Sequence, residues 1–145
     1  MQQPAAWARV HDDDPLAAAR AHGVLAEKRL LESEGGVLGA DEVASALHIS
    51  RQAVDKRRRN RKLLGVRRGA TRWVYPAWQL AKGHTVPGLP DVLHALRDHD
   101  PLSQVTFFLA PEGFLGDRTP LEVLRAGDLV RVLKAAERYR EQGLD

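Results

Sequence analysis

The chain has 145 residues, of which 43% are hydrophobic and 28% are charged, and its formal net charge is +3. This length suits one ordinary domain or two small ones, and the apolar content is enough for a modest core, which excludes a wholly disordered basic peptide. The sequence has no cysteine, so disulfide frameworks, thiol catalysis and cysteine-ligated zinc or iron–sulfur sites are excluded.

Several features together predict a cytoplasmic protein. The N-terminus has no basic stretch followed by an apolar one, so no signal peptide is expected. No run approaches the roughly 18–20 apolar residues of a membrane span. The absence of cysteine fits a reducing compartment.

The first 39 residues predict an arm, a helix and a linker. Residues 1–13 are expected to form a loose arm, with Asp14 as N-cap and Pro15 as the first residue of a helix that runs to about Leu31. The glycine-rich stretch 34–39 is expected to end this helix as a linker. Its glycines lack the spacing of a phosphate-binding loop.

Residues 40–62 predict two short helices joined by a tight turn. Val43 and Leu47 fall on one face of the first helix, and Ser50 is placed to cap the second, which extends to about Lys62. The turn residue is His48, where glycine is more usual. A helix, a turn and a second helix rich in arginine form the helix-turn-helix pattern.

Charge is concentrated in this region. Residues 51–72 carry ten of the 22 basic residues and one acid, a net charge of +9, which leaves −6 for the rest of the chain. A mildly acidic body with one basic segment is typical of a nucleic-acid binder. The alternative is a solvated charged face, although like charges at helical spacing repel one another.

A cap at Ser50 would divide the second helix into two faces. Val54 would point into the core, while the opposite side would carry residues suited to reading base edges, because arginine recognises guanine, glutamine adenine and aspartate the cytosine amino group. These residues are Arg51, Gln52, Asp55, Lys56 and Arg59.

The core face of this helix has no apolar residue after Val54. Arg57, Arg58 and Arg61 stand where apolar side chains are expected. Two explanations are open: the arginine stems cover the edge of the core, or the helix leaves the core and runs along DNA phosphates.

Residues 63–76 predict a β-hairpin, or wing, directly after the second helix. Its Arg67, Arg68 and Arg72 suit phosphate or minor-groove contacts, and a solubilising hairpin is the alternative. Trp73, Tyr75 and Trp78 could stack on bases, but a hydrophobic anchor is favoured. Pro76 is expected to start a helical segment over 77–83.

The order helix, turn, helix and wing resembles winged-helix domains of the MerR and excisionase type. The predicted DNA-binding residues are Ser50, Arg51, Gln52, Asp55, Lys56, Arg57, Arg58, Arg59, Arg61, Lys62, Arg67, Arg68 and Arg72.

The last third of the chain predicts helices. After a Gly/Pro linker at 83–88 comes an amphipathic helix with Val92, Leu93 and Leu96 inward, and residues 102–111 follow as a buried helix, with a strand as the alternative. Thr119 and Glu122 have the spacing of a capping box. Gly127 closes that helix, and a last helix runs from Asp128 to about Gln142.

No metal, cofactor or catalytic set is expected, and the protein is predicted not to be an enzyme. His94, Asp98, His99 and Asp100 lie close in sequence, but without a second cluster the end of a surface helix is favoured over a metal site. No nucleophile–base pair is found, so a small hydrolase has no residue set to support it.

Residues 114–139 resemble the Xre/MbcA/ParS toxin-binding domain of RES-Xre toxin–antitoxin systems. Leu115-Gly116 and the run from Arg118 to Leu121 match its "LGGRTPLELL" core, with Asp117 in place of the second glycine. The resemblance covers about 89–145 and implies a homodimeric type II antitoxin that represses its own operon and masks a RES-type, NAD-consuming toxin. The residues it implies for toxin binding are Arg118, Arg140, Gln142, Gly143, Leu144 and Asp145.

Together these patterns predict a mainly α fold: a winged helix-turn-helix with one small β-hairpin, plus a C-terminal helical toxin-binding and dimerisation domain. The expected parts are 1–36 (arm and helix), 37–82 (DNA-binding domain), 83–88 (linker) and 89–145 (C-terminal domain). The predicted function is an antitoxin that neutralises a toxin and binds operator DNA. The alternative is a stand-alone dimeric transcriptional regulator or recombination-accessory factor without a toxin partner.

Overall fold

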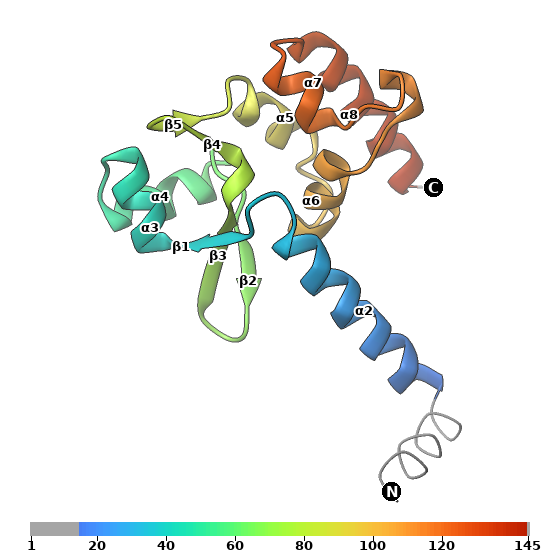
Figure 1. Ribbon diagram of the computed structural model, residues 1–145, viewed down its shortest axis with the longest axis horizontal. Coiled ribbons are helices and arrows are strands. Elements are labelled where there is room, and N and C mark those ends of the chain that lie inside the picture. The colour runs from blue at the N-terminus through green and yellow to red at the C-terminus, as the bar shows by residue number, and fades with distance from the viewer. Residues whose placement is uncertain (1–14, 145) are drawn as a thin grey trace, which may run out of the picture. The chain divides into compact units, whose positions relative to one another are not determined.

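A computed structural model describes residues 15–144 of the chain (Figure 1). The predicted arm at 1–13, the predicted N-cap Asp14 and the predicted toxin-binding residue Asp145 lie outside the described residues. The chain divides into two compact units, Met1–Ser33 and Glu34–Asp145.

The described part of the first unit is helix α2 (Pro15–Glu32), which confirms the helix predicted from residue 15 to about 31. Alanine, leucine and long charged residues favour this conformation. Gly23 lies inside the helix, where it costs about 1 kcal/mol relative to alanine. Leu16, Val24 and Leu25 are exposed on its surface.

The second unit begins with the predicted helix pair, α3 (Ala40–Leu47) and α4 (Arg51–Arg59). His48 makes the turn with a φ of 56°, in the left-handed region, and the amide of Ile49 donates to the Ala44 carbonyl at 3.0 Å. A non-glycine residue therefore closes α3 with the hydrogen bond that a C-terminal cap requires. Helix α4 ends three residues earlier than expected.

A three-stranded antiparallel sheet accompanies the helix pair, with β1 (Val37–Gly39), β2 (Val66–Arg68) and β3 (Arg72–Pro76) in the order β1-β3-β2. The hairpin β2–β3 was predicted. The interpretation of 34–39 as a linker was wrong, because β1 pairs with β3, Leu38 facing Tyr75. A three-residue strand between glycines is too short to show alternation, and its partner lies far along the chain.

The helix expected after Pro76 is also absent from the described structure. One 3₁₀ turn, η1 (Ala77–Gln79), leads into a second small hairpin of β4 (Leu80–Ala81) and β5 (His84–Thr85). The side chain of Gln79 is fully buried and accepts a hydrogen bond from the amide of Leu64 at 2.8 Å, which holds the turn against the strand entry. This tertiary bond overrides the local helical composition.

Four helices complete the unit: α5 (Leu89–Ala95), α6 (Pro101–Leu109), α7 (Pro120–Arg125) and α8 (Leu129–Leu144), with a 3₁₀ turn η2 (Gly113–Leu115). Residues 102–111 are thus helical over most of their length, and the strand alternative is wrong. The amide of Glu122 donates to Thr119 Oγ1 at 3.1 Å, and the amide of Thr119 to Glu122 Oε1 at 3.3 Å, which confirms the capping box.

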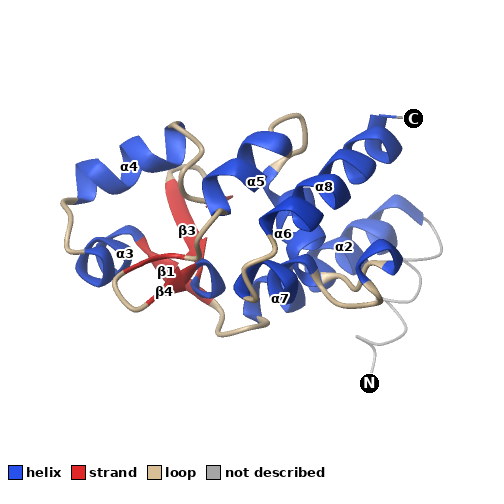
Figure 2. Ribbon diagram, turned by 90° about the horizontal axis from the view of Figure 1, so that it is seen from above, coloured by secondary structure: helices blue, strands red, loops and turns tan. Residues whose placement is uncertain are grey.

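The second unit has a mainly helical fold in which α3 and α4 lie beside the strands and α5 to α8 pack together (Figure 2). Trp78, from the turn after β3, contacts Phe108 of α6 with ring centroids 4.8 Å apart. Val86 is buried within the stretch expected as a linker, and residues 34–145 form one unit. Within residues 15–144, no helix is both long and apolar enough to cross a membrane.

Candidate nucleic-acid interface

Val54 packs helix α4 against the core, and a side-chain cap at Ser50 marks where the helix begins. Val54 is completely buried in a cluster with Val43, Leu47 and Tyr75. Ser50 Oγ accepts a hydrogen bond from the amide of Ala53 at 3.0 Å, as predicted for an N-cap. Because Val54 points inward, the opposite side of α4 faces solvent.

Of the predicted base-reading residues, Gln52, Lys56 and Arg59 lie on that outer side, and Arg51 lies in the exposed first turn of α4. Arg51, Gln52, Lys56 and Arg59 are exposed, and the side chain of Asp55 is 43% exposed. Arg51 is paired with Asp41 of α3 at 3.4 Å, but both groups are well exposed. A surface pair of this kind is worth about 0–1 kcal/mol, so it holds the guanidinium only weakly.

Arg58 lies differently from the other arginines of α4. Its guanidinium stacks on the Trp73 ring at 3.9 Å, its Nε donates to the Tyr75 hydroxyl at 3.2 Å, and one terminal nitrogen lies 3.4 Å from Asp55. Only 17% of its side chain is exposed. Of the two explanations left open by the sequence, Arg58 follows the first: its stem covers the edge of the core.

The sequence predicted Arg58 as a DNA-binding residue, but its placement gives it a structural role. Two of its N–H groups donate to Tyr75 and Asp55 and its flat face covers Trp73, and two of these three residues belong to β3. Burial raises the pKa of the Tyr75 hydroxyl, while the hydrogen bond and charge of Arg58 act in the opposite direction. Arg58 therefore joins α4 to the hairpin.

The aromatic residues of this region form an anchor, as the sequence favoured. Tyr75 and Trp78 are buried, and Trp73 is half-buried beneath Arg58. Gly65 permits this packing, because a Cβ at that position would lie 2.6 Å from Cδ of Arg58. No local pattern in the sequence indicated the close packing at Gly65 or the burial of Gln79.

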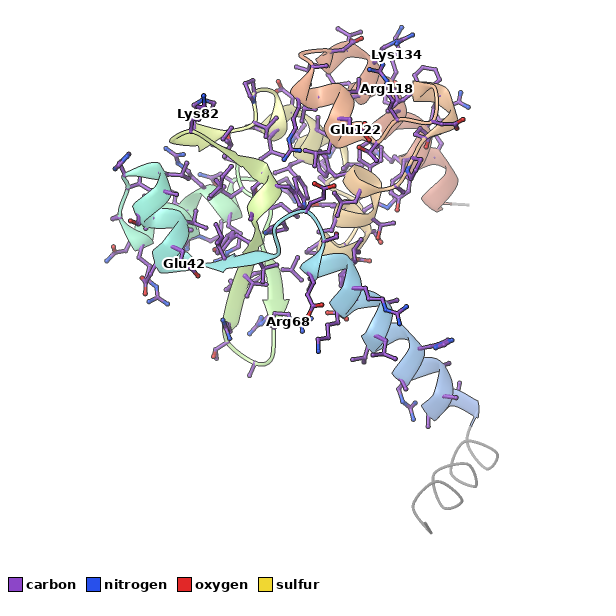
Figure 3. All side chains as sticks on the ribbon, in the orientation of Figure 1. Glu42, Arg68, Lys82, Arg118, Glu122 and Lys134 are labelled. Carbon is purple, nitrogen blue, oxygen red and sulfur yellow. The ribbon has the colours of Figure 1, made fainter. Side chains whose placement is uncertain are left out.

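The β2–β3 hairpin carries three exposed arginines, Arg67, Arg68 and Arg72, around a turn at Gly69. Figure 3 labels Arg68 on this hairpin and Glu42 on α3. Arg68 faces Arg72 across the strand pair, while the guanidinium of Arg67 donates to the Ala70 carbonyl and so braces the turn.

A groove of about 610 Å³ lies between the start of α3, helix α4 and the hairpin turn, and we call it the α3–α4–hairpin groove. It brings Arg51 and Arg72 to one concavity, together with Asp41 and Asp55. Arg57 is half-buried. Arg61 and Lys62 lie in the turn after α4, where the left-handed backbone of Arg61 (φ 57°) allows the Lys62 amide to donate to the Arg57 carbonyl at 2.8 Å.

Three of the four residues considered for a metal, Asp98, His99 and Asp100, contact other side chains or helix ends. Asp98 pairs with Arg140 at 2.7 Å, and Asp100 caps α6 by accepting from the Ser103 amide at 2.9 Å. His99 stacks on Tyr139 with ring centroids 4.8 Å apart. In the part of the chain that the structure describes, no group of three or more acidic or histidine side chains could hold a metal ion.

The residues implied for toxin binding are not brought together into a described site. Arg118 is exposed in the loop before α7, where its Nε donates to the Leu115 carbonyl at 3.4 Å. Arg140 lies on α8 in its pair with Asp98. Gln142, Gly143 and Leu144 lie in the last turn of α8, where the side chains are not described, and Asp145 lies outside the described residues.

Comparison with known proteins identifies a similar fold. No protein-family model matches the chain, and no curated protein matches it. A solved structure, the NMR structure of Rv2175c, superposes with a TM-score of 0.63 at 21% sequence identity, and the match covers 74% of this chain and 83% of that one. At this identity the likeness shows the fold alone.

Proposed function

We propose that the region from β1 to β3 is a winged helix-turn-helix that binds double-stranded DNA. Helix α4 would enter the major groove, and the β2–β3 hairpin would be the wing. The proposal rests chiefly on one observation: Val54 and Arg58 hold α4 against the core, while Arg51, Gln52, Lys56 and Arg59 are exposed to solvent. A recognition helix presents its side chains in this way.

The side chains divide into two roles by their chemistry. Arg51 and Gln52 lie at the N-terminal end of α4, which contacts base edges in helix-turn-helix proteins, and both can form bidentate hydrogen bonds to a purine. Lys56, Arg57 and Arg59 lie further along α4, and we expect them to contact phosphates. Arg67, Arg68 and Arg72 of the hairpin would contact phosphates or the minor groove of the flanking DNA.

A DNA-binding regulator is the class of function that these roles support. We propose that it acts as a homodimer, with two copies of α4 in successive major grooves about 34 Å apart. The net charge of +9 within 51–72 would draw this surface toward DNA in preference to the acidic remainder of the chain.

The test is a binding titration of the full chain against random and selected duplexes over a range of salt concentrations. Replacing Lys56, Arg57 and Arg59 by alanine removes three cations, so the slope of log K against log[salt] should become shallower by about 2.7. The control replaces Lys134, Arg138 and Glu137 of α8, exposed residues on another helix, and should leave the slope unchanged. An unchanged affinity and slope in the α4 variant would exclude DNA binding by α4.

The narrower antitoxin role stays a proposal that rests on the resemblance at 114–139. The loop and capped helix of that resemblance are present, and Gly116 and Asp117 both have left-handed backbone, with φ of 70° and 62°. Asp117 thus accommodates the turn for which the family pattern has glycine. The test is co-purification with the product of the neighbouring gene; a protein that binds DNA but captures no such partner would be a stand-alone regulator.

A further inference from the structure

A second cleft lies at the opposite end of α4 from its N-cap. It has a volume of about 270 Å³, and we call it the Arg97 cleft. Arg59 and Arg61 line it from the end of α4 and the turn that follows, and Arg97 and His99 line it from the segment between α5 and α6. Leu63, Leu64 and Leu93 are buried beneath these groups.

The cleft is positively charged, and the acids near it are engaged elsewhere. Among the described residues that line it, none is an aspartate or glutamate. Asp98 pairs with Arg140 at 2.7 Å, and Asp100 accepts from both the amide and the hydroxyl of Ser103, at 2.9 and 3.1 Å. The exposed guanidinium groups of Arg59, Arg61 and Arg97 therefore face a cleft without a carboxylate.

Capping of helix ends explains only part of this arrangement. One terminal nitrogen of Arg97 donates to the His94 carbonyl at 2.9 Å, in the last turn of α5. A guanidinium has five N–H groups, so others remain to bind an anion. Neither Arg59 nor Arg61 lies in α5, so capping of that helix does not account for three cations around one cleft.

The Arg97 cleft continues the proposed DNA surface. Arg58 and Trp73 line both this cleft and the α3–α4–hairpin groove, so the stacked pair forms a wall with arginines on either side. Arginine matches phosphate by paired N–H···O bonds, and the cleft is small for an organic ligand but large enough for a phosphate group.

We propose that the Arg97 cleft binds a phosphate group of the DNA backbone, so that Arg97 is a DNA contact supplied from outside the winged helix-turn-helix. The inference rests on the proposed DNA-binding function and extends the interface beyond the recognition helix. It predicts that the helical C-terminal part of the second unit helps to position the duplex, where the sequence assigned it only to dimerisation and toxin binding.

The experiment compares the DNA affinity of Arg97→Ala, Arg97→Lys and Lys134→Ala with the unaltered protein at 50 and 200 mM salt. Removing one phosphate contact should make the slope of log K against log[salt] shallower by about 0.9. The ratio of the DNA affinity of the unaltered protein to that of Arg97→Ala should therefore fall about 3.5-fold between 50 and 200 mM salt. The loss should be equal for all duplex sequences. Arg97→Lys should restore most of the slope, and Lys134→Ala, an exposed cation on α8 (Figure 3), should leave it unchanged.

Lys56→Ala, an exposed cation of α4 that does not line the cleft, separates failure of this inference from failure of the proposed function. If Lys56→Ala lowers the slope and Arg97→Ala does not, the protein binds DNA but the Arg97 cleft is not a contact. If the unaltered protein binds no duplex, both proposals fall. Free phosphate is the other possible ligand of the cleft, and a titration with inorganic phosphate, followed by NMR at the amides of Arg97 and His99, tests it. Chemical-shift changes at these amides, together with an unchanged DNA affinity in Arg97→Ala, would assign the cleft to free phosphate and overturn the DNA contact.

Discussion

Arg58 and Arg59 are adjacent arginines of α4, but substitution of Arg58 should lower stability and substitution of Arg59 should weaken DNA binding. Arg58→Ala removes the stacking on Trp73, worth about 0.5–2 kcal/mol, and a hydrogen bond to the Tyr75 hydroxyl, worth about 1 kcal/mol. We expect the free energy of unfolding to fall by about 1.5–3 kcal/mol in total. At roughly 4 °C per kcal/mol for a unit of this size, the Tm should fall by about 6–12 °C.

Arg59→Ala is the matched control, because it removes the same charge from the next residue of the same helix. Arg59 is exposed, so its loss should change stability by no more than about 0.5 kcal/mol. Its effect should appear in DNA binding, where the salt slope becomes shallower by about 0.9. Arg58→Ala should change that slope less than Arg59→Ala does, because its guanidinium is held against Trp73, Tyr75 and Asp55.

Thermal unfolding and salt-dependent DNA titration of the two variants distinguish the structural role of Arg58 from the DNA-binding role of Arg59. A double-mutant cycle with Trp73→Ala should give a coupling energy of about 0.5–2 kcal/mol for Arg58 and none for Arg59. The reasoning is refuted if Arg58→Ala lowers the salt slope as much as Arg59→Ala does and leaves the Tm unchanged.

Four further predictions concern stability, each measured by denaturant or thermal unfolding. Gln79→Leu should cost about 2–4 kcal/mol, because it leaves a buried amide and carbonyl of Leu64 without partners; an effect below 1 kcal/mol would contradict this. Gly65→Ala should cost about 1–3 kcal/mol, because its Cβ would press on a packed arginine stem; a stabilised variant would disprove that crowding. Thr119→Ala should cost about 1 kcal/mol through loss of the capping box, and Thr119→Ser should recover most of it. Burial raises the pKa values of Tyr75 and Tyr139 above 10.0, so their contribution to stability is complete below pH 10 and is lost as the pH rises through the folded-state values; a flat profile from pH 9 to 11.5 would refute it.

The parts of the fold that sequence predicted correctly depend on neighbours within a few positions. The caps at Ser50 and Thr119 are side-chain hydrogen bonds that span three residues, and they mark the starts of α4 and α7. The inward positions of Val54 and Val92 follow from helical periodicity over one or two turns. Local patterns of this kind also predicted the outward position of most of the basic side chains.

The sequence did not explain why the core face of α4 lacks apolar residues after Val54, because the contacts that replace them lie on β3. Arg58 fills the position by stacking on Trp73 and bonding to Tyr75, 17 residues further on. Arginine can serve there because its flat guanidinium covers an aromatic ring while its N–H groups are satisfied. The charge pattern of α4 is the same whether Arg58 is exposed or stacked on an aromatic ring, so the pattern cannot predict which of the two occurs.

The sequence by itself determined that α3 and α4 exist, where each begins, which of their faces is buried and that a basic hairpin follows, because each of these depends on short-range periodicity and capping. The tertiary structure alone decided that β1 joins the sheet, that Gln79 ends the expected helix by bonding to Leu64, and that Arg58 joins α4 to β3. It also brought Arg97 to the end of α4. The physical reason is that pairing, buried hydrogen bonds and shared clefts depend on residues far apart in the chain, whose meeting no local pattern encodes.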